Sequence, residues 1–375
     1  MTLDKASNMP LYLQLKNAIM DMINSGELKA GDPMKTEAEL CAEFGISRYP
    51  IRQALALLVD EGFLNRTRGR GTFINAELPV GAKRDKSKLL GLVMNHLTAG
   101  FNSQILCGFE KRARRRGYLT VACSSEGNEE EELNCIDKLI EANVGGMFVF
   151  PCDNSKLHTK LNKLIENKTY LGLLDRDPLM NNIDYVGSDN LGGAYAAVRH
   201  ISMQGFRNVV FISDMMDVSS VKERIEGFLK AVEDFDLEVV TQIDIKEDIS
   251  KLYRTTHRFY IEKLREEIIE LKKHTPFGVF ALNDFIAIYC MNIFKEEGLI
   301  IGKDVAVVGF DNINESEYTD VNLTTVAQNG ILLGQSAADI AIDKLEGKTN
   351  QVYRSIIPTQ LVIRNSCGER GNGRI

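Results

Sequence analysis

The chain has 375 residues, of which 44% are hydrophobic and 26% are charged, as expected for a globular protein of two or three domains. Its formal net charge of −7 argues against unspecific coating of nucleic acid. The charge is unevenly divided, because residues 1–88 carry a net +2 and residues 89–375 carry −9.

Composition also limits the location and the chemistry of the protein. No apolar run reaches the roughly 18–20 residues that cross a bilayer, and the first residues do not have the pattern of a signal peptide. The seven cysteines form no CxxC pair, and the five histidines lack metal-ligand spacing. We therefore expect a cytoplasmic protein with reduced, mostly buried cysteines and with neither a metal nor a cofactor.

Residues 11–45 predict two helices. Apolar residues at helical spacing indicate the first helix over 11–23. Thr36 and Glu39 have the spacing of a capping box, which predicts that a short second helix begins there. Gly45 is placed to end that helix in the left-handed conformation.

A third helix is expected from Ser47, its predicted N-cap, to about Asp60. Pro50 falls in the first turn, where backbone N–H groups have no intrahelical partner and proline is tolerated. Ile51, Ala54, Leu55, Leu58 and Val59 form one apolar face, opposite Tyr49, Arg52 and Gln53, with Arg48 at the edge. This arrangement is typical of a helix-turn-helix, whose second helix enters the major groove N-terminus first.

The next segment predicts a hairpin rich in arginine. Residues 63–64 and 72–74 indicate two short strands, and Gly69 and Gly71 allow a tight tip between them. The arginines of this segment are Arg66, Arg68 and Arg70. Each feature taken alone could be a solvated basic surface, but their order along the chain favours a winged helix-turn-helix that binds DNA.

Three stretches within residues 9–75 resemble the GntR-type winged-helix domain: PLYLQLKNAIMDMINSGELKAGD, TEAELCAEFGISRYPIRQALALLVDEGFL and GRGTFI. The resemblance implies DNA contacts for Arg48, Arg52 and Arg70, with Lys35 and Glu37 near the DNA backbone. This chain departs from the family by Lys35–Thr36 where Pro-Ser is usual, and Tyr49 and Pro50 are also unusual. The predicted DNA-binding residues are Lys35, Glu37, Ser47, Arg48, Tyr49, Arg52, Gln53, Arg68 and Arg70.

Beyond this domain, predicted as residues 1–75, the pattern changes. Residues 76–88 mix proline, glycine and charge without an apolar period, which indicates a linker. Apolar runs then alternate with amphipathic stretches, which predicts an α/β domain with parallel sheets over residues 89–366, before a tail at 367–375. The runs are residues 89–94, 119–123, 146–150, 170–174, 208–213, 277–282 and 305–310.

Such folds bind ligands at the carboxyl ends of their strands. The residues that follow these runs carry hydroxyls, amides, carboxylates and few arginines, a set that suits a sugar; His96, Asp175, Asn283 and Asp311 are among them. No catalytic motif is found, so an enzyme is not expected. Two alternatives remain: a sugar-binding transport protein, and a sugar-processing enzyme that uses Asp175 and Asp311 as acid and base.

Most of residues 89–366 resembles the effector domain of the LacI/GalR repressors, itself similar to periplasmic sugar-binding proteins. The stretches that carry this resemblance are DYVGSDNLGGAYAAVRHISMQGFRNVVFIS, VKERIEGFLKAVED, FALNDFIAI and DVAVVGFDN followed by LTTVAQNGILLG. The resemblance implies a homodimer and two lobes, one formed by 89–186 and 326–355 and the other by 187–325 and 356–366. It also implies an effector site of Asp175, Arg224, Asn283, Asp311 and Gln328. His96 is added to this predicted site because it follows the first strand of the domain. For Arg224 the alternative is an ion pair across the cleft.

A GntR-type head on a LacI/GalR-type body resembles the arabinose repressors of Gram-positive bacteria. This resemblance implies that L-arabinose controls binding to operator DNA, although the cleft residues suit other pentoses and hexoses. The sequence therefore predicts a dimeric, sugar-responsive repressor that binds double-stranded operator DNA and no membrane.

Overall fold

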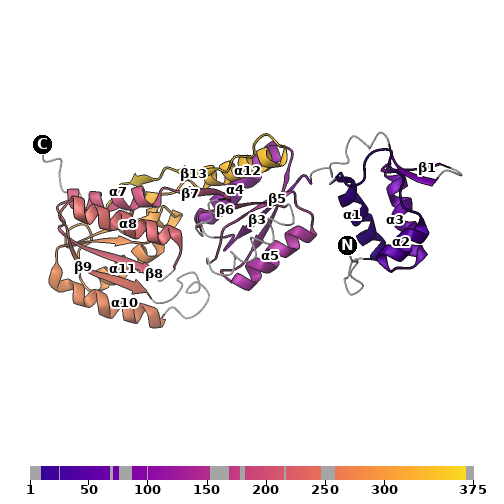
Figure 1. The fold of residues 1–375 in the computed structure, drawn as a ribbon. Coiled ribbons are helices and arrows are strands. Elements are labelled where there is room, and N and C mark those ends of the chain that lie inside the picture. Colours follow the sequence, from indigo (N-terminus) through magenta and orange to yellow (C-terminus); the bar gives the residue numbers. More distant parts are fainter. Residues whose placement is uncertain are drawn as a thin grey trace. The chain divides into compact units, whose positions relative to one another are not determined.

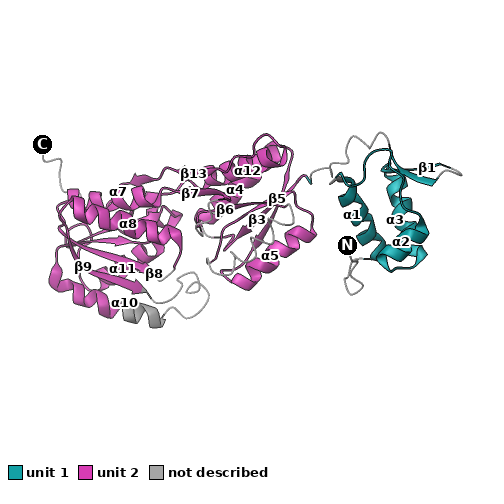
Figure 2. Ribbon diagram, in the orientation of Figure 1, with its two compact units in different colours: residues 1–87 teal, residues 88–375 magenta. Residues whose placement is uncertain are grey.

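The computed structural model describes residues 10–24, 26–67, 71–75, 87–98, 100–152, 169–177, 182–214, 217–245 and 258–368. The chain divides into two compact units, residues 1–87 and 88–375 (Figure 2). Among the described residues, no helix is long and apolar enough to cross a membrane.

The described part of the first unit contains three helices and a hairpin. The helices are α1 (Leu11–Asn24), α2 (Glu37–Phe44) and α3 (Arg48–Asp60). Strand β1 (Leu64–Thr67) pairs antiparallel with β2 (Gly71–Ile74). Apolar side chains from all three helices and from both strands form one buried core, as the helical stripes predict; it includes Leu15, Ile19, Leu40, Ile51, Leu58, Leu64 and Ile74.

Local signals in the sequence set the ends of these helices. The capping box is formed, because the Thr36 hydroxyl accepts from the Glu39 N–H at 3.3 Å and the Glu39 carboxylate accepts from the Thr36 N–H at 2.7 Å. Gly45 ends α2 with φ at 61°, as expected. Ser47 is the N-cap residue of α3, as predicted, but its side chain makes no capping hydrogen bond.

The hairpin is joined to the helices by a third segment. Gly31 N–H donates to Ile74 O at 3.0 Å, Ile74 N–H donates to Asp32 O at 2.8 Å, and Met34 N–H donates to Thr72 O at 2.8 Å. The loop between α1 and α2 therefore pairs with the free edge of β2 and holds the hairpin against the helices. Arg68 and Arg70, predicted to contact DNA, lie outside the described residues, as do the linker residues 76–86 and the tail residues 369–375.

The second unit contains two six-stranded sheets. The first sheet has the order β13-β7-β6-β5-β3-β4, and the second has the order β14-β12-β11-β10-β8-β9. All neighbouring strands pair parallel except β12 and β14, which pair antiparallel. The first sheet is made of β3 (Leu89–Met94), β4 (Leu119–Ser124), β5 (Gly146–Val149), β6 (Tyr170–Leu174), β7 (Asp184–Ser188) and β13 (Arg354–Ile357). The second is made of β8 (Asn208–Asp214), β9 (Glu238–Ile245), β10 (Phe277–Ala281), β11 (Val305–Asp311), β12 (Thr324–Ala327) and β14 (Gln360–Val362).

Helices cover both faces of each sheet (Figure 1). Leu90 and Leu92 of β3 belong to the core beneath α4 (Gly100–Arg115) and α12 (Gly330–Leu345), whereas Val93 belongs to the core beneath α5 (Glu129–Glu141). In the second lobe, α7 (Asn190–Met203) and α8 (Ser219–Asp234) pack together, and α10 (Arg258–Leu271) packs against α11 (Asp284–Glu296). Burial on both faces explains why these strands read as continuous apolar runs.

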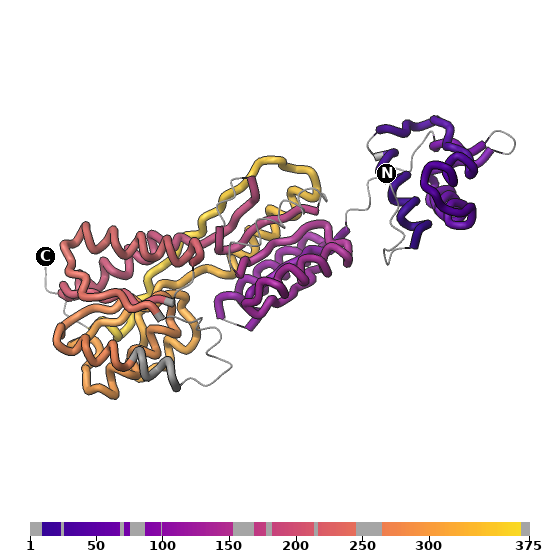
Figure 3. The backbone as a smooth tube through the Cα atoms, turned by 60° about the horizontal axis from the view of Figure 1, so that its bottom comes forward, coloured from indigo at the N-terminus to yellow at the C-terminus, as the bar shows by residue number. Residues whose placement is uncertain are grey.

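The chain passes between the two lobes three times, after β7, after β12 and between β13 and β14. In Figure 3 the yellow C-terminal part of the chain runs beside both the magenta first lobe and the orange second lobe. The resemblance to the LacI/GalR effector domain implied passages near residues 187, 326 and 356. In the structure β7 runs to Ser188, β12 stays in the second sheet to Ala327, and β13 ends at Ile357.

Two features bring α4 and α12 into close contact. A Cβ atom added at Gly108 would lie 2.1 Å from Ile331 O, and one added at Gly334 would lie 2.0 Å from Ile105 O. At the helix ends, the Arg116 guanidinium lies 3.1 Å from Asp339, 2.8 Å from Asp343 and 3.0 Å from Glu346. Glycine therefore sets the distance between these helices, and an ion-pair network joins them at one end.

We expect Gly334→Ala to lower the free energy of unfolding of the 88–375 unit by roughly 1–3 kcal/mol, because the added methyl group must push α4 away. Leu332→Ala, on the same helix and 40% exposed, is the matched control and should change it by less than about 0.5 kcal/mol. Urea titrations of the full chain followed by circular dichroism measure both. Equal effects of the two substitutions would contradict the close contact.

Candidate functional site

The exposed end of α3 carries the predicted DNA-reading side chains. Arg48, Tyr49 and Arg52 are exposed, and Tyr49 is 71% exposed although it is a large aromatic residue. Gln53 is half-buried, and its Nε2 donates to the Tyr49 hydroxyl at 3.4 Å. Because α3 buries Ile51, Ala54, Leu55 and Leu58 in the core, this polar face is directed outward at the N-terminal end of the helix.

Two other predicted residues of this surface are held by ion pairs. The Arg52 Nε donates to the Glu37 carboxylate at 2.9 Å, and Arg66 on β1 reaches the other Glu37 oxygen at 3.4 Å. Lys35 lies 2.8 Å from both oxygens of Glu43 on α2. The structure therefore brings Glu37 and Arg52 together and joins them to Arg66, an arginine outside the predicted set.

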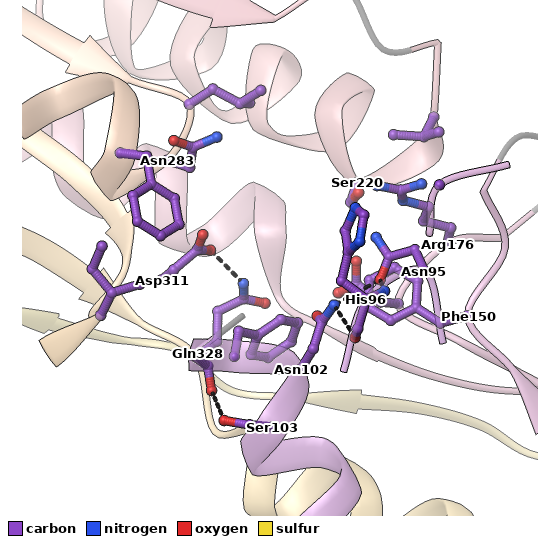
Figure 4. A pocket seen from close by; sticks show the side chains of 18 of the residues that line it. Asn95, His96, Asn102, Ser103, Phe150, Arg176, Ser220, Asn283, Asp311 and Gln328 are labelled. Carbon is purple, nitrogen blue, oxygen red and sulfur yellow. Dashed lines mark hydrogen bonds between the residues drawn. The ribbon is translucent and has the colours of Figure 1, made fainter. Parts of the chain in front are cut away.

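A cavity of about 560 Å³ lies between the two lobes of the second unit (Figure 4). The carboxyl ends of strands from both sheets contribute to its wall, as expected for parallel sheets. All six residues predicted for the effector site line it: His96, Asp175, Arg224, Asn283, Asp311 and Gln328. Among the described lining residues there are four carboxylates, Glu126, Asp175, Asp311 and Glu315, and two arginines, Arg176 and Arg224.

The first-lobe wall follows β3. Asn102 on α4 donates through Nδ2 to Asn95 Oδ1 at 2.7 Å and to His96 O at 2.9 Å. The His96 N–H donates to the same Asn95 oxygen at 2.9 Å, and the His96 Nδ1 lies 3.8 Å from the Glu126 carboxylate. These bonds fix the loop after β3, so that the half-buried His96 imidazole faces the cavity (Figure 4).

Asp175 follows β6 with a φ of 58°, a conformation that asparagine and aspartate tolerate better than most residues. The residue is only 4% exposed, and within the described part of the chain its Oδ1 makes no hydrogen bond. Burial raises the pKa of this carboxyl, while the charges of Arg224 and Arg176 oppose the shift. A buried acceptor at the cavity wall is suited to a ligand hydroxyl, because an unmade hydrogen bond there is costly.

Arg176 shapes the same wall from the neighbouring position. Its guanidinium donates to Pro151 O at 2.9 Å and to Cys152 O at 2.7 Å, and it lies 5.2 Å from the centre of the Phe150 ring. The arginine thus joins the ends of β5 and β6 and places an aromatic face at the cavity. Sugars present apolar C–H faces that pack on such rings.

Arg224 on α8 is the centre of the second-lobe wall. Its Nε donates to Asn190 Oδ1 at 3.0 Å, its NH1 group donates to Leu282 O at 2.7 Å, and its NH2 group lies 3.7 Å from Asp311. The guanidinium carbon lies 3.7 Å from the centre of the Phe310 ring. Arg224 therefore forms an ion pair with Asp311, but this pair joins two elements of the second lobe. It is not the ion pair across the cleft that was the alternative for Arg224.

Asp311, Gln328 and Asn283 complete this wall. Gln328 Nε2 donates to Asp311 Oδ1 at 2.7 Å (Figure 4), so one carboxylate accepts from Gln328 and lies beside Arg224. The Asn283 side chain caps α11 by accepting from the Ile286 N–H at 2.9 Å. Asn283 therefore has a structural role in addition to its place at the cavity wall.

Behind Asp311 lies a fully buried carboxyl group, Asp284. It accepts from the Ile313 N–H at 2.9 Å and from the Thr325 hydroxyl. Burial raises the pKa of Asp284 to about 8, and the nearby negative charge of Asp311 adds to the shift. The proton on this carboxyl is therefore coupled to the charge at the cavity wall.

Arg176 and Asn95 directly follow strands and were expected at the cleft on that signal, although not in the effector set. Asn102 and Ser220 were missed, because they lie on helices, where no strand end marks them. Among the described residues, no group of three or more His, Cys, Asp or Glu side chains could hold a metal ion.

Comparison with known proteins finds one family in each of the two units. Residues 11–74 match the family of bacterial regulatory proteins of the gntR type, and residues 198–367 match a periplasmic binding protein-like domain. The arabinose metabolism transcriptional repressor of Geobacillus stearothermophilus is 26% identical, over 97% of this chain and 100% of the relative. The repressor of the same name from Halalkalibacterium halodurans is also 26% identical, over 96% of each chain.

Solved structures agree with the α/β fold predicted for the second unit. A LacI family transcriptional regulator from Enterococcus faecium, solved with bound ribose, covers 75% of this chain and 98% of its own with a TM-score of 0.63 and 23% identity. The lac repressor dimer bound to operator and the anti-inducer ONPF covers 76% of this chain and 96% of its own with a TM-score of 0.65 and 20% identity. The predicted fold class is confirmed.

The raised pKa of Asp284 predicts a pH dependence of stability. Because the folded state binds this proton more tightly than the unfolded state does, stability falls as the pH rises from about 4 towards the folded pKa of about 8. Between pH 5 and pH 9 we expect the unfolding midpoint of the wild type to fall further than that of Asp284→Asn, which lacks the ionisable group.

Thermal scans at several pH values measure this difference. Asp217→Asn, at a side chain that is 82% exposed, is the control and should follow the wild type at every pH. If the midpoints of the wild type and of Asp284→Asn ran parallel between pH 5 and pH 9, the assignment of the raised pKa to Asp284 would be refuted.

Proposed function

Because the chain joins a bacterial regulatory domain of the gntR family to a periplasmic binding protein-like domain, we propose that it is a sugar-controlled transcriptional repressor. The observation that carries the proposal is the coexistence, on one chain, of an outward arginine-bearing helix and a polar cavity between two lobes. A regulator is favoured over an enzyme, because two relatives that match over nearly the whole chain are named as repressors.

The chemistry of the cavity favours a neutral polyhydroxylated ligand. Both lining arginines already donate to backbone carbonyls of the protein, and four carboxylates lie among the lining residues. The lining carboxylates would repel a phosphate or a carboxylate on the ligand, whereas ligand hydroxyls can donate hydrogen bonds to Asp175 and Asp311. The names of the two full-length relatives make L-arabinose the first choice of effector, and another pentose or hexose is the alternative.

Control of DNA binding requires two coupled states. We place the sugar between the lobes, where its contacts with both walls favour the closed arrangement. In a homodimer formed through the second unit, closure would change the separation of the two DNA-binding units, which must both meet their half-sites. L-Arabinose would thus release the repressor from its operators.

A ligand screen tests the effector. The chain contains no tryptophan, so dye-based thermal unfolding is the suitable readout. At about a hundred times its dissociation constant, L-arabinose should stabilise the protein by roughly 2.7 kcal/mol, and D-glucose 6-phosphate should have no effect. A response to D-xylose, D-ribose or D-galactose in place of L-arabinose would replace the effector, and a response to no sugar would reject the sugar site.

Two substitutions should separate the two activities. Arg52→Ala should weaken binding to an operator duplex, selected from a random pool, by roughly 10- to 150-fold while the sugar response is kept. Arg224→Ala should keep DNA binding but abolish release by sugar, because the cavity loses its central donor. Arg115→Ala, an exposed arginine of α4, is the control for loss of charge and should change neither property. Normal release by sugar in Arg224→Ala would show that the site is misassigned.

A further inference from the structure

Glu37 is an acidic residue on the predicted DNA-binding surface. It is the first residue of α2, and one carboxylate oxygen accepts from the Arg52 Nε at 2.9 Å while the other lies 3.4 Å from the Arg66 NH2 group. The Glu37 side chain is 23% exposed, whereas those of Arg52 and Arg66 are 66% and 71% exposed. Three elements, α2, α3 and β1, therefore meet at one carboxylate.

The contribution of this cluster to stability is small, because exposed ion pairs contribute little to folding. A lone carboxylate on a DNA-binding surface would also repel phosphates. Glu37 is not alone, however, since its carboxylate pairs with the guanidinium groups of Arg52 and Arg66. The three charges add up to a net charge of +1. A role of the Glu37 carboxylate in orienting the two arginines accounts for both its small contribution to stability and its place on a basic surface.

The geometry at Arg52 supports this role. The bond to Glu37 uses Nε, and within the described part of the chain no other hydrogen bond to the Arg52 guanidinium is made. Its two terminal amino groups are thus available, and paired donors of a guanidinium are what reads O6 and N7 of guanine. Fixing Nε reduces the rotamer freedom that Arg52 would otherwise lose on binding DNA.

Arg66 gives the cluster its second function. It lies on β1, the first strand of the arginine-rich hairpin, and it is exposed. Through Glu37 it is held next to the arginine of the recognition helix, so the hairpin and α3 present their charges together. An exposed guanidinium at this place suits a DNA phosphate.

On the basis of the proposed operator binding, we propose that Glu37 is a positioning residue that orients Arg52 for base recognition, and that Arg66 is a phosphate contact coupled to Arg52 through the same carboxylate. The two arginines then have different effects: Arg52 sets the preference for sequence, and Arg66 adds affinity for any duplex.

The test measures dissociation constants of the full-length protein for a selected operator duplex and for a scrambled duplex, over a range of salt concentrations. Glu37→Gln should reduce the ratio between the two affinities by roughly 10-fold, because Arg52 is no longer oriented. Arg66→Ala should weaken binding to both duplexes about equally and reduce the salt slope by about 1, and Arg66→Lys should restore that slope.

Glu61→Gln is the matched control, because Glu61 is a surface carboxylate of the same unit that pairs with Lys16. It removes the same charge and should leave the operator preference intact. If Glu37→Gln behaved like Glu61→Gln, the positioning role would be overturned, and a salt slope unchanged in Arg66→Ala would overturn the phosphate contact. If Glu37→Gln failed to fold, Arg66→Ala would still test the phosphate contact, and Arg52→Ala would still test the base contact.

The outcome is separable from the proposed function. A wild type without preference for any selected duplex would reject operator binding itself. A wild-type preference that is lost in Arg52→Ala but kept in Glu37→Gln would retain operator binding and reject only the positioning role.

Discussion

A buried cation organises the cleft. Arg224 is only 7% exposed, and a guanidinium so far from water needs acceptors from the protein. Those acceptors come from three elements: Asn190 at the start of α7, Leu282 O after β10 and Asp311 at the end of β11. The ends of these elements therefore converge on one side chain. Together they form the second-lobe wall of the cavity, which faces the first lobe.

A separate polar cluster joins the two lobes. Asp177, which follows β6 in the first lobe, donates through its N–H to the Ser219 hydroxyl at the start of α8 at 2.7 Å. The Asp177 carboxylate pairs with Arg354 on β13, next to the last passage between the lobes. Arg224 lies on the same helix, α8, as Ser219. A change in the separation of the lobes would therefore change the bond between Asp177 and Ser219 and the position of Arg224 together. This is the kind of element through which a ligand can alter a distant unit.

Patterns local in the sequence predicted the helix ends and the strand ends well. Thr36 and Glu39 are three residues apart, so their capping box is visible without the fold, and Asp175 and Asp311 were found because they directly follow apolar runs. Contacts between distant residues were not visible. Glu37, Arg52 and Arg66 meet only after α2, α3 and β1 pack, and Asn102 reaches the cavity from a helix whose apolar spacing says nothing about its polar side. The missing bond at Ser47 shows that a residue can fill a capping position without capping.

The distribution of charge explains why such contacts matter for DNA recognition. Affinity for any duplex grows with the number of phosphates that a protein neutralises, but residues 1–88 carry a net charge of only +2 and the rest of the chain carries −9. In the operator binding proposed above, weak unspecific binding would leave discrimination to the few exposed arginines of α3 and to Arg66 on β1. Their guanidinium groups must then be held in fixed directions, and the same acidic residues that lower the net charge, Glu37 above all, are available to hold them. A low net charge and arginines held by ion pairs would then belong to one arrangement, in which the proposed operator preference depends more on geometry than on total charge.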